Sequence, residues 1–554
     1  MPPDPAPPVL KAAPASTWAP LAIPAFRGLW IAGLVSDLGG WMHGVGEGWL
    51  LTSLTASPRT VALLQAVDGA ALFLLALPAG ALADIADRRR LAIGTQIWLS
   101  ACAGSMACLA AVGALPASLL IGFAFAMGVG AALDEPLWQA LTAEAVPGSL
   151  LPMAVTLGGV SMNLARSLGP AAGGVIVALA GPAAVFGLNA LTFLGVIAAL
   201  VRLRSHKVTA SAPAERWVGA MGAGLRYVRH TKALRAVLFR CGVSVLPGSV
   251  LAALLPLYAR RVLHLSPAGF GLLLGCMGVG ALVAAWRLPT IRTRVSADRL
   301  LTLGALTFAV ALVVLFAAGA LAPAALGMVA AGAGWMTMLS GLNIAAQLAT
   351  ASWVRARVLS VYLLVFQGGL SIGSLLWGEV AVRLGIRQAF LVAAGALATS
   401  LVAHTRYPLE FVEEDMTPLL LWPMPRIVRD IEEDDGPVRV LIEYSVPEAN
   451  APSFSRLLRA REHRRRRGGA IEWGLYRDVS KPTRWLETFV VHSWGEHERQ
   501  HSRTTAADRR SATHIATLLE PGTSPVIRHF IASDAWSSEE SALRAGGAPK
   551  TSCA

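Results

Sequence analysis

Hydrophobic residues fall in long, nearly unbroken runs up to about residue 403, and beyond that point the chain is rich in charge. A helix needs ~20 apolar residues to cross the ~30 Å hydrocarbon core of a bilayer. Because a chain inside lipid must satisfy its own backbone hydrogen bonds, each run predicts a membrane-spanning helix. About twelve spans are predicted: Phe26–Leu51, Arg59–Ala83, Leu91–Val112, Ala117–Ala143, Leu151–Ala180, Ala183–Val201, Leu234–Ala259, Pro267–Trp286, Leu300–Ala320, Pro323–Ala349, Val358–Val382 and Ile386–Ala403.

Basic residues between the predicted spans lie mostly on one side. Successive connections lie on alternate sides of the membrane. Those on one side, with the termini, hold twenty Lys and Arg residues, and those on the other side hold five: Arg59, Arg260, Arg261, Arg383 and Arg387. Lys and Arg collect in cytoplasmic loops, so the richer set predicts the cytoplasmic side. Both termini are then cytoplasmic, and the chain is expected in a bacterial inner membrane.

The longest connection between the spans divides six from six. This layout is typical of transporters built from two related halves, with the substrate site between them near the midplane. The predicted fold class is an all-α membrane protein in two six-helix halves, followed by a C-terminal α+β domain. The predicted parts are a disordered cytoplasmic N-terminus (1–24), an N-terminal half (25–203), a cytoplasmic linker (204–232), a C-terminal half (233–406), a second linker (407–436), a cytoplasmic α+β domain (437–533) and a disordered tail (534–554).

Composition agrees with a membrane protein, because 55% of the 554 residues are hydrophobic and the mean hydropathy is +0.56. The net charge of +13 follows largely from the loop asymmetry, so no nucleic-acid partner is expected. The five cysteines show no metal-ligand spacing and predict no disulfide framework. The chain has no GxxxxGK[ST] motif, so it is not expected to hydrolyse ATP, and no cofactor is expected.

From Val438 the apolar pattern alternates with a period of two, interrupted by helical stretches. The predicted order is strand, helix, strand, strand, helix, strand, over Val438–Val446, Ser453–Arg466, Ile471–Asp478, Trp485–His492, Trp494–Leu518 and Val526–Ile531. This β-α-β-β-α-β order is the ferredoxin-like arrangement.

In this domain, residues 497–501 fit the zinc-protease pattern H-E-x-x-H. The pattern places His497 and His501 on one face of a helix. The flanking residues are very polar, and no third ligand follows on a defined element. We therefore interpret the stretch as a solvated helix face and predict no metal site.

The loop between the second and third predicted spans carries the strongest motif, residues 80–90. It resembles the major facilitator superfamily pattern G-x-L-x-D-x-x-G-R-[RK], with Asp87 where the family usually has Gly. Gly80 permits close helix approach, and Asp84 can accept hydrogen bonds from a helix N-terminus or pair with an arginine. With Arg88 and Arg89, these residues predict a latch that stabilises one access state. The alternative is an ordinary cytoplasmic loop.

Span five contains Gly169, Pro170, Gly173 and Gly174. These residues resemble the end of the antiporter motif of exporting members of the superfamily, although Ala165 stands where that motif has glycine. Proline kinks a helix and glycines allow a neighbour to approach. The alternative is plain helix packing without any role in antiport.

Several ionisable residues lie inside predicted spans, where charge is costly and usually faces a cavity or a partner. Asp37, Asp68, Asp134 and Glu135 are candidate proton-coupling groups, and Arg166 is a candidate partner for one of them or for an anionic substrate. The alternative for each is a structural ion pair. That alternative is favoured for the remaining two acidic residues, Glu47 and Glu379, which lie near span ends.

Three features together resemble the enterobactin-exporter-like branch of the superfamily, also called transmembrane secretion effectors. They are the Asp84 loop, the stretch Asn163–Pro170 and the tail segments Glu472–Asp478 and Glu487–His497. The resemblance implies a proton-driven exporter of siderophores, drugs or other metabolites. It also implies a tail similar to small antibiotic-biosynthesis monooxygenases, through which two copies of the chain are expected to pair.

Two other classes of function compete with a transporter: a membrane-tethered monooxygenase-like enzyme, and a sensor or scaffold that no longer transports. Charged residues in several spans favour transport, because an anchor needs one span and no carboxylates at membrane depth. The chain is therefore predicted to be a secondary-active exporter and not an enzyme. Its substrate is not specified by these patterns.

Overall fold

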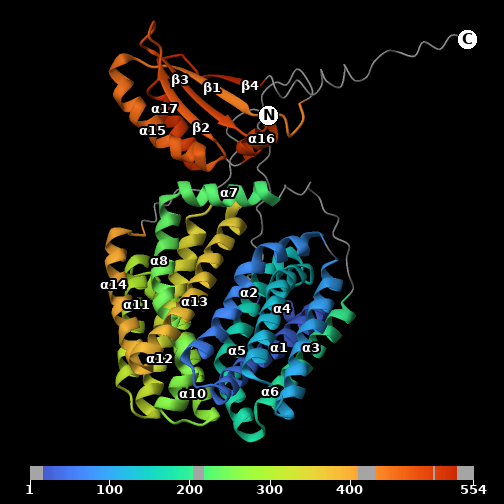
Figure 1. Ribbon diagram of the computed structural model, residues 1–554. Helices are drawn as coiled ribbons and strands as arrows, with labels where there is room; N and C mark the ends of the chain where they lie inside the picture. Colours follow the sequence, from blue (N-terminus) through green and yellow to red (C-terminus); the bar gives the residue numbers. More distant parts are fainter. Residues whose placement is uncertain are drawn as a thin grey trace, which may run out of the picture. The chain divides into compact units, whose positions relative to one another are not determined.

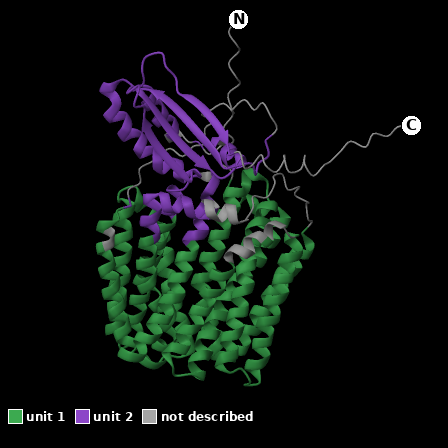
Figure 2. Ribbon diagram, turned by 45° about the horizontal axis from the view of Figure 1, so that its top comes forward, with its two compact units in different colours: residues 1–211, 239–343, 363–408 green, residues 212–238, 344–362, 409–554 purple. Residues whose placement is uncertain are grey.

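The computed structural model describes residues 16–85, 87–203, 217–409, 431–502, 504 and 506–532. Most of the predicted N-terminal segment, much of both predicted linkers and the predicted tail lie outside these residues. The chain divides into two compact units, one formed by residues 1–211, 239–343 and 363–408, and the other by residues 212–238, 344–362 and 409–554 (Figure 2).

Helices occupy each of the predicted spans (Figure 1). The first six are α1 (Pro24–Leu54), α2 (Pro58–Ile85), α3 (Arg88–Ala111), α4 (Ala117–Glu144), α5 (Leu151–Ala180) and α6 (Pro182–Arg202). The second set consists of α8 (Lys232–Gly248), α9 (Val250–Leu257), α10 (Pro267–Arg292), α11 (Ala297–Ala317), α12 (Leu321–Leu348), α13 (Arg355–Leu384) and α14 (Ile386–Arg406). The seventh predicted span comprises α8, α9 and a π-helical turn at Tyr258–Val262.

Ten helices of the described part of the chain are long and apolar enough to cross a membrane. At the two remaining predicted positions, α1 is 31 residues long, and the apolar stretch of α14 is the shorter Ile386–Val402. Local signals set several helix ends. Pro267 begins α10 behind the cap Ser266, whose hydroxyl accepts a hydrogen bond from the Gly269 amide at 3.3 Å. Gly181, at φ +78°, joins α5 to α6 in a conformation that other residues rarely adopt.

One helix was not predicted. Within the expected linker, α7 (Trp217–His230) precedes α8. Its apolar residues Trp217, Met221, Leu225 and Val228 recur at helical spacing, but fourteen residues are too few to span a bilayer. The basic residues around them led the sequence analysis to expect a linker only.

The C-terminal residues form a four-stranded antiparallel sheet with helices between its strands. The elements are β1 (Val438–Ser445), α15 (Ala451–Arg467), β2 (Glu472–Arg477), β3 (Arg484–Val491), α16 (Trp494–Ser502), α17 (Ala506–Ala516) and β4 (Val526–Ile531). The strand order is β2-β3-β1-β4, so β1 is central and pairs Val438 with both Val491 and Ile531. Buried side chains of β1, β3 and α15, including Ile442, Phe454 and Phe489, form the core. The predicted last helix is two helices, α16 and α17.

Candidate functional site

Three carboxylates of the first half lie within electrostatic reach of one another. Asp37 comes from α1, and Asp134 and Glu135 come from α4. The Ser161 hydroxyl on α5 donates a hydrogen bond to Asp37 Oδ2 at 3.0 Å, and Gln96 Nε2 on α3 donates to Asp134 Oδ1 at 2.8 Å. Four helices therefore place polar groups around one acidic cluster at membrane depth.

Asp68 belongs to a second acidic group. It lies within electrostatic reach of Glu47 on α1. The Nε2 atom of His43 lies 3.2 Å from Glu47 Oε1, and both side chains are buried. His43 was not among the predicted residues, although its spacing of four from Glu47 places the two on one helix face.

Arg166 on α5 lies over the ring of Trp41 on α1, with 5.5 Å between the guanidinium carbon and the ring centroid. Its Nε atom is buried and has no hydrogen-bond partner among the described residues. A buried guanidinium N–H without an acceptor is unusual, because buried polar groups are normally hydrogen-bonded. Arg166 can therefore receive an anionic group in this position.

The predicted glycines of α5 lie at close helix contacts. A Cβ atom at Gly169 would lie 2.6 Å from the Cβ of Trp41, and one at Gly173 would lie 2.8 Å from the Cα of Met42. Both residues thus face α1. A Cβ at Gly174 would lie 2.9 Å from the Cα of Gly271 on α10, and Pro170 lies inside the same helix.

The glycines of α10 that face α5 were not among the predicted residues. A Cβ at Gly278 would lie 2.6 Å from the Cα of Ser167, and one at Gly275 would lie 3.4 Å from the Cβ of Ala171. With Gly271, these glycines recur every three or four residues, a spacing that permits close helix packing. Helices α5 and α10 thus meet backbone to backbone across the two halves.

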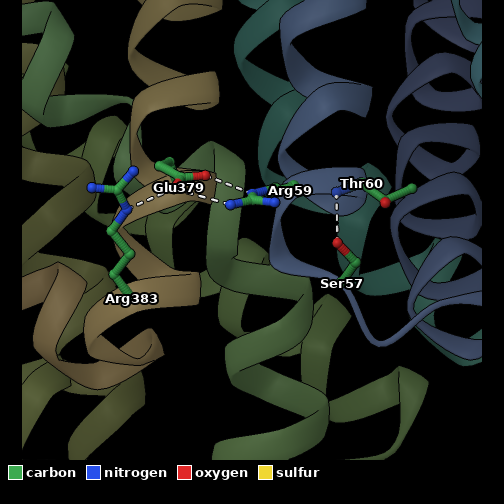
Figure 3. A network of polar contacts seen from close by, with 5 residues as sticks. All are labelled: Ser57, Arg59, Thr60, Glu379 and Arg383. Atoms are coloured by element: carbon green, nitrogen blue, oxygen red, sulfur yellow. Dashed lines mark hydrogen bonds and ion pairs between the residues drawn. The ribbon is translucent and has the colours of Figure 1, made fainter.

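A second contact between the halves joins α2 to α13. The Arg59 guanidinium reaches Glu379 with both Nε and Nη2, at 2.5 Å from Oε2 and 3.0 Å from Oε1 (Figure 3). Glu379 also accepts a hydrogen bond from Arg383 Nε at 2.7 Å. Beside this cluster, a Cβ at Gly378 would lie 3.2 Å from the Cα of Arg59.

For the predicted latch residues Gly80 and Asp84, the structure describes the helical backbone but not the surroundings or the Asp84 side chain. Of the others, Arg88 Nη1 lies 2.7 Å from Glu144 Oε1 at the end of α4. Arg89 donates to the carbonyl oxygens of Leu200 and Val201 at the end of α6, at 2.8 and 2.6 Å. The start of α3 is thereby tied to two helix ends of its own half.

Asp87, which stands where the family motif usually has glycine, has a structural role at the start of α3. Its carboxylate accepts a hydrogen bond from the Arg90 amide at 3.0 Å and caps the N-terminus of α3. Negative charge there also complements the helix dipole.

The C-terminal domain buries one carboxylate completely. Glu487 on β3 accepts hydrogen bonds from Tyr444 Oη at 2.8 Å, Arg465 Nε at 3.0 Å and Trp473 Nε1 at 3.2 Å. Burial raises the pKa of Glu487, but the charges of Arg465 and Arg461 and these hydrogen bonds outweigh it and lower the pKa to about 2. Glu487 is therefore a charged member of a satisfied core network.

The prediction of a solvated face for residues 497–501 is wrong. His497 is only 3% exposed, because α16 packs with Trp494 and His497 inward, and ring centroids of His497 and His529 lie 4.6 Å apart. Burial, together with the neighbouring His529, His501 and Arg465, lowers the pKa of His497 to about 3. The third histidine comes from β4, far along the chain, so local spacing did not reveal it.

A family described as transmembrane secretion effector matches residues 15–537 of this chain. Among curated proteins, the staphyloferrin A transporter of Staphylococcus aureus is 24% identical over 279 residues, which are 50% of this chain and 69% of the relative.

Solved transporters resemble this chain in fold. A bacterial homolog of the human lysosomal transporter Spinster, inward-facing and unoccupied, matches 71% of this chain and 98% of its own, with a TM-score of 0.59 and 12% identity. A POT family transporter in complex with 5-aminolevulinic acid matches 69% of this chain and 96% of its own, with a TM-score of 0.55 and 15% identity.

Proposed function

The chain belongs to the transmembrane secretion effector family of major facilitator transporters, and from this premise we propose that it exports small organic molecules by proton-coupled alternating access. It is a multi-pass membrane transporter and not an enzyme. The proposal adds three things to the family assignment: the direction, the coupling ion and the residues that carry them.

The observation that carries the proposal is an acidic cluster in the same helical half as a buried arginine without an acceptor for its Nε atom. Asp37, Asp134 and Glu135 gather from α1 and α4, and Arg166 extends from α5 over Trp41. Charges at membrane depth are costly and usually mark ion pathways or substrate sites. In the proposal, the carboxylates and Asp68 take up and release protons, and Arg166 binds an anionic substrate or neutralises a carboxylate after proton release.

Two of the contacts between the halves bear on how the protein changes its access state. The α5–α10 contact and the Arg59–Glu379 pair involve the portions of their helices nearest the α1–α2 and α5–α6 turns. The scarcity of basic residues in the connections at that end supports placing it outside. We therefore propose that the structure represents an inward-open state, in which Gly80, Asp84, Arg88 and Arg89 act as a latch when the cytoplasmic side closes.

Siderophores are the first substrate class to examine, because the curated relative transports one. Arg166 favours an anionic member of that class, since a guanidinium binds carboxylates with paired hydrogen bonds. Drugs and other metabolites are the second class. A bacterial inner membrane with cytoplasmic termini is the proposed location.

The C-terminal residues are proposed to form a ferredoxin-like cytoplasmic domain that pairs two copies of the chain. Its edge strands β2 and β4 each have one strand partner in the described residues, which leaves an edge for another copy. The domain boundaries predicted from the sequence, including 437–533 for this domain, are also part of the proposal. Native mass spectrometry of the full-length protein in detergent tests it, because a monomer at all concentrations would contradict pairing.

Transport into liposomes with an imposed proton gradient tests the main proposal. The purified protein is screened against siderophores and lipophilic drugs, with flux measured in both gradient directions. Gradient-dependent movement supports a proton-coupled transporter. Substrate movement opposite to the proton flow supports export by antiport, and movement with the protons contradicts it. A folded protein that moves no compound contradicts the proposal.

Coupling is tested with Asp37→Asn, Asp68→Asn and Glu135→Gln in the same assay. At least one is expected to lose gradient-driven flux while retaining exchange of substrate. Glu472→Gln, at an exposed carboxylate of β2, is the matched control. Wild-type flux in all three variants would show that these carboxylates are not the coupling groups.

A further inference from the structure

The C-terminal domain gathers three histidines that the transport mechanism does not use. His497 and His501 lie one helical turn apart on α16, and His529 lies on β4. One ring nitrogen from each lies within 4.8 Å of the other two. We propose that this cluster binds a divalent transition-metal ion of the zinc type.

The spacing fits a shared ion. Tetrahedral coordination with metal–nitrogen bonds of ~2.0–2.1 Å places neighbouring ligand atoms about 3.3 Å apart. His497 Nε2 and His501 Nε2 are 3.2 Å apart, which meets this requirement without movement. A ring nitrogen of His529 lies within 4.8 Å of the other two ligand atoms, so binding requires His529 to move closer by about 1–1.5 Å.

The surroundings of His497 exclude water from its ring. Its Nδ1 atom is buried and has no hydrogen-bond partner among the described residues. Trp494 packs against it, with ring centroids 5.4 Å apart, and also against His529 at 6.1 Å, so the cluster is shielded on that side. A buried imidazole is a common metal ligand through its Nε2 atom.

The ligand set selects the class of ion. Imidazole nitrogen suits zinc, copper, nickel and cobalt, whereas magnesium and calcium require oxygen ligands. Three protein ligands leave a fourth coordination position for water or another exchangeable ligand. The neighbouring Glu498 is engaged elsewhere, because its Oε1 accepts a hydrogen bond from Trp494 Nε1 at 2.9 Å. This arrangement holds α16 in place and does not present Glu498 as a general base.

Metal binding to the full-length protein tests the proposal. The protein is purified without a polyhistidine tag, stripped with a chelator and dialysed against zinc or cobalt. We expect one metal ion per chain by elemental analysis, and cobalt absorption bands typical of nitrogen ligands. His501→Gln and His529→Gln should each weaken binding by more than the roughly 100-fold that loss of an outer-shell partner produces.

His514→Gln is the matched control, because His514 is exposed on α17 of the same domain and should be replaceable without effect. Zinc should also raise the thermal unfolding midpoint of the wild-type protein and of this control, but not of the double variant His501→Gln/His529→Gln. The double variant's unfolding without metal reports whether it folds. A wild-type protein that binds no zinc or cobalt overturns the proposal. So does a folded His529→Gln variant that binds as the wild type does.

Discussion

Arg59 and Glu379 are separated by 320 positions in the sequence and form a bidentate ion pair between α2 and α13 (Figure 3). The pair joins the two halves of the membrane part, whereas the second partner of Glu379, Arg383, lies on the same helix. A charge pair across the halves must break whenever they separate at this end. It is therefore a contact through which a single substitution can shift the conformational equilibrium.

Glu379→Gln should favour the state in which α2 and α13 are separated, because it removes the charge that holds Arg59. Spin labels at Ser57 and Val382, in a cysteine-free background, report the separation by pulsed electron resonance. The population with the longer distance should increase. Arg383→Gln is the control, since it leaves the pair between the halves intact. Unchanged distances in both Glu379→Gln and Arg59→Gln would show that the pair does not hold the halves together.

Gly278→Val should destabilise the protein and abolish transport, because the new side chain would overlap the backbone of Ser167. Overpacking of this kind typically costs about 1–3 kcal/mol. Gly158→Val introduces the same side chain on α5 at a position with open space, and it should behave as the wild type does. Thermal unfolding in detergent and liposome flux measure both. Equal behaviour of the two variants would contradict close contact between α5 and α10.

Arg166→Gln should raise the KM for anionic substrates by roughly tenfold or more, since a hydrogen bond to a charged group contributes about 1.5–3 kcal/mol. Neutral substrates should be affected less. Arg261→Gln, at an exposed arginine beyond α9, serves as the control. The measurement is initial flux against substrate concentration for an anionic and a neutral compound. An equal change in KM for both compounds would argue against recognition of charge by Arg166.

The C-terminal domain should lose stability as the pH falls from about 4.5 towards 2. Glu487 has a pKa of about 2 in the fold against an ordinary value of 4.5, so its contribution is fully present above 4.5 and disappears as the folded carboxylate is protonated. Hydrogen exchange of the β1 and β3 amides in the full-length protein measures this loss.

Glu487→Gln should destabilise the domain by roughly 3 kcal/mol at neutral pH, because it leaves Arg465 buried without its partner. It should also reduce the acid-dependent part of the loss. Glu472→Gln, at a mostly exposed carboxylate, should do neither. Neutral-pH exchange rates that are the same in Glu487→Gln and the wild type would show that the network contributes little.

The elements could be predicted because their signals are local. Apolar runs of bilayer length indicated the helices, and alternation of period two indicated β1 to β4. Contacts between distant elements left no such signal. A structural ion pair was the favoured interpretation of Glu379, and the structure confirms it, but the sequence did not identify Arg59 as the partner. His529 was likewise not recognised as a neighbour of His497. The burial of His497 was mispredicted for the same reason, because the polar neighbours of α16 in sequence do not reveal what packs against it.

The contact between α5 and α10 is made by backbone atoms at Gly174, Gly271 and Gly278. A contact made mainly by glycine backbone and small side chains has few rotamers to rearrange, so tilting one helix on the other changes little side-chain entropy. Such a contact can act as a pivot: it fixes the position about which the halves rotate, and its own free energy changes little as they rotate. We therefore expect polar pairs such as Arg59–Glu379 to contribute more than this contact does to the free energy difference between the access states. Substitutions at those pairs would then change the access equilibrium and the transport rate without altering the packing of α5 on α10.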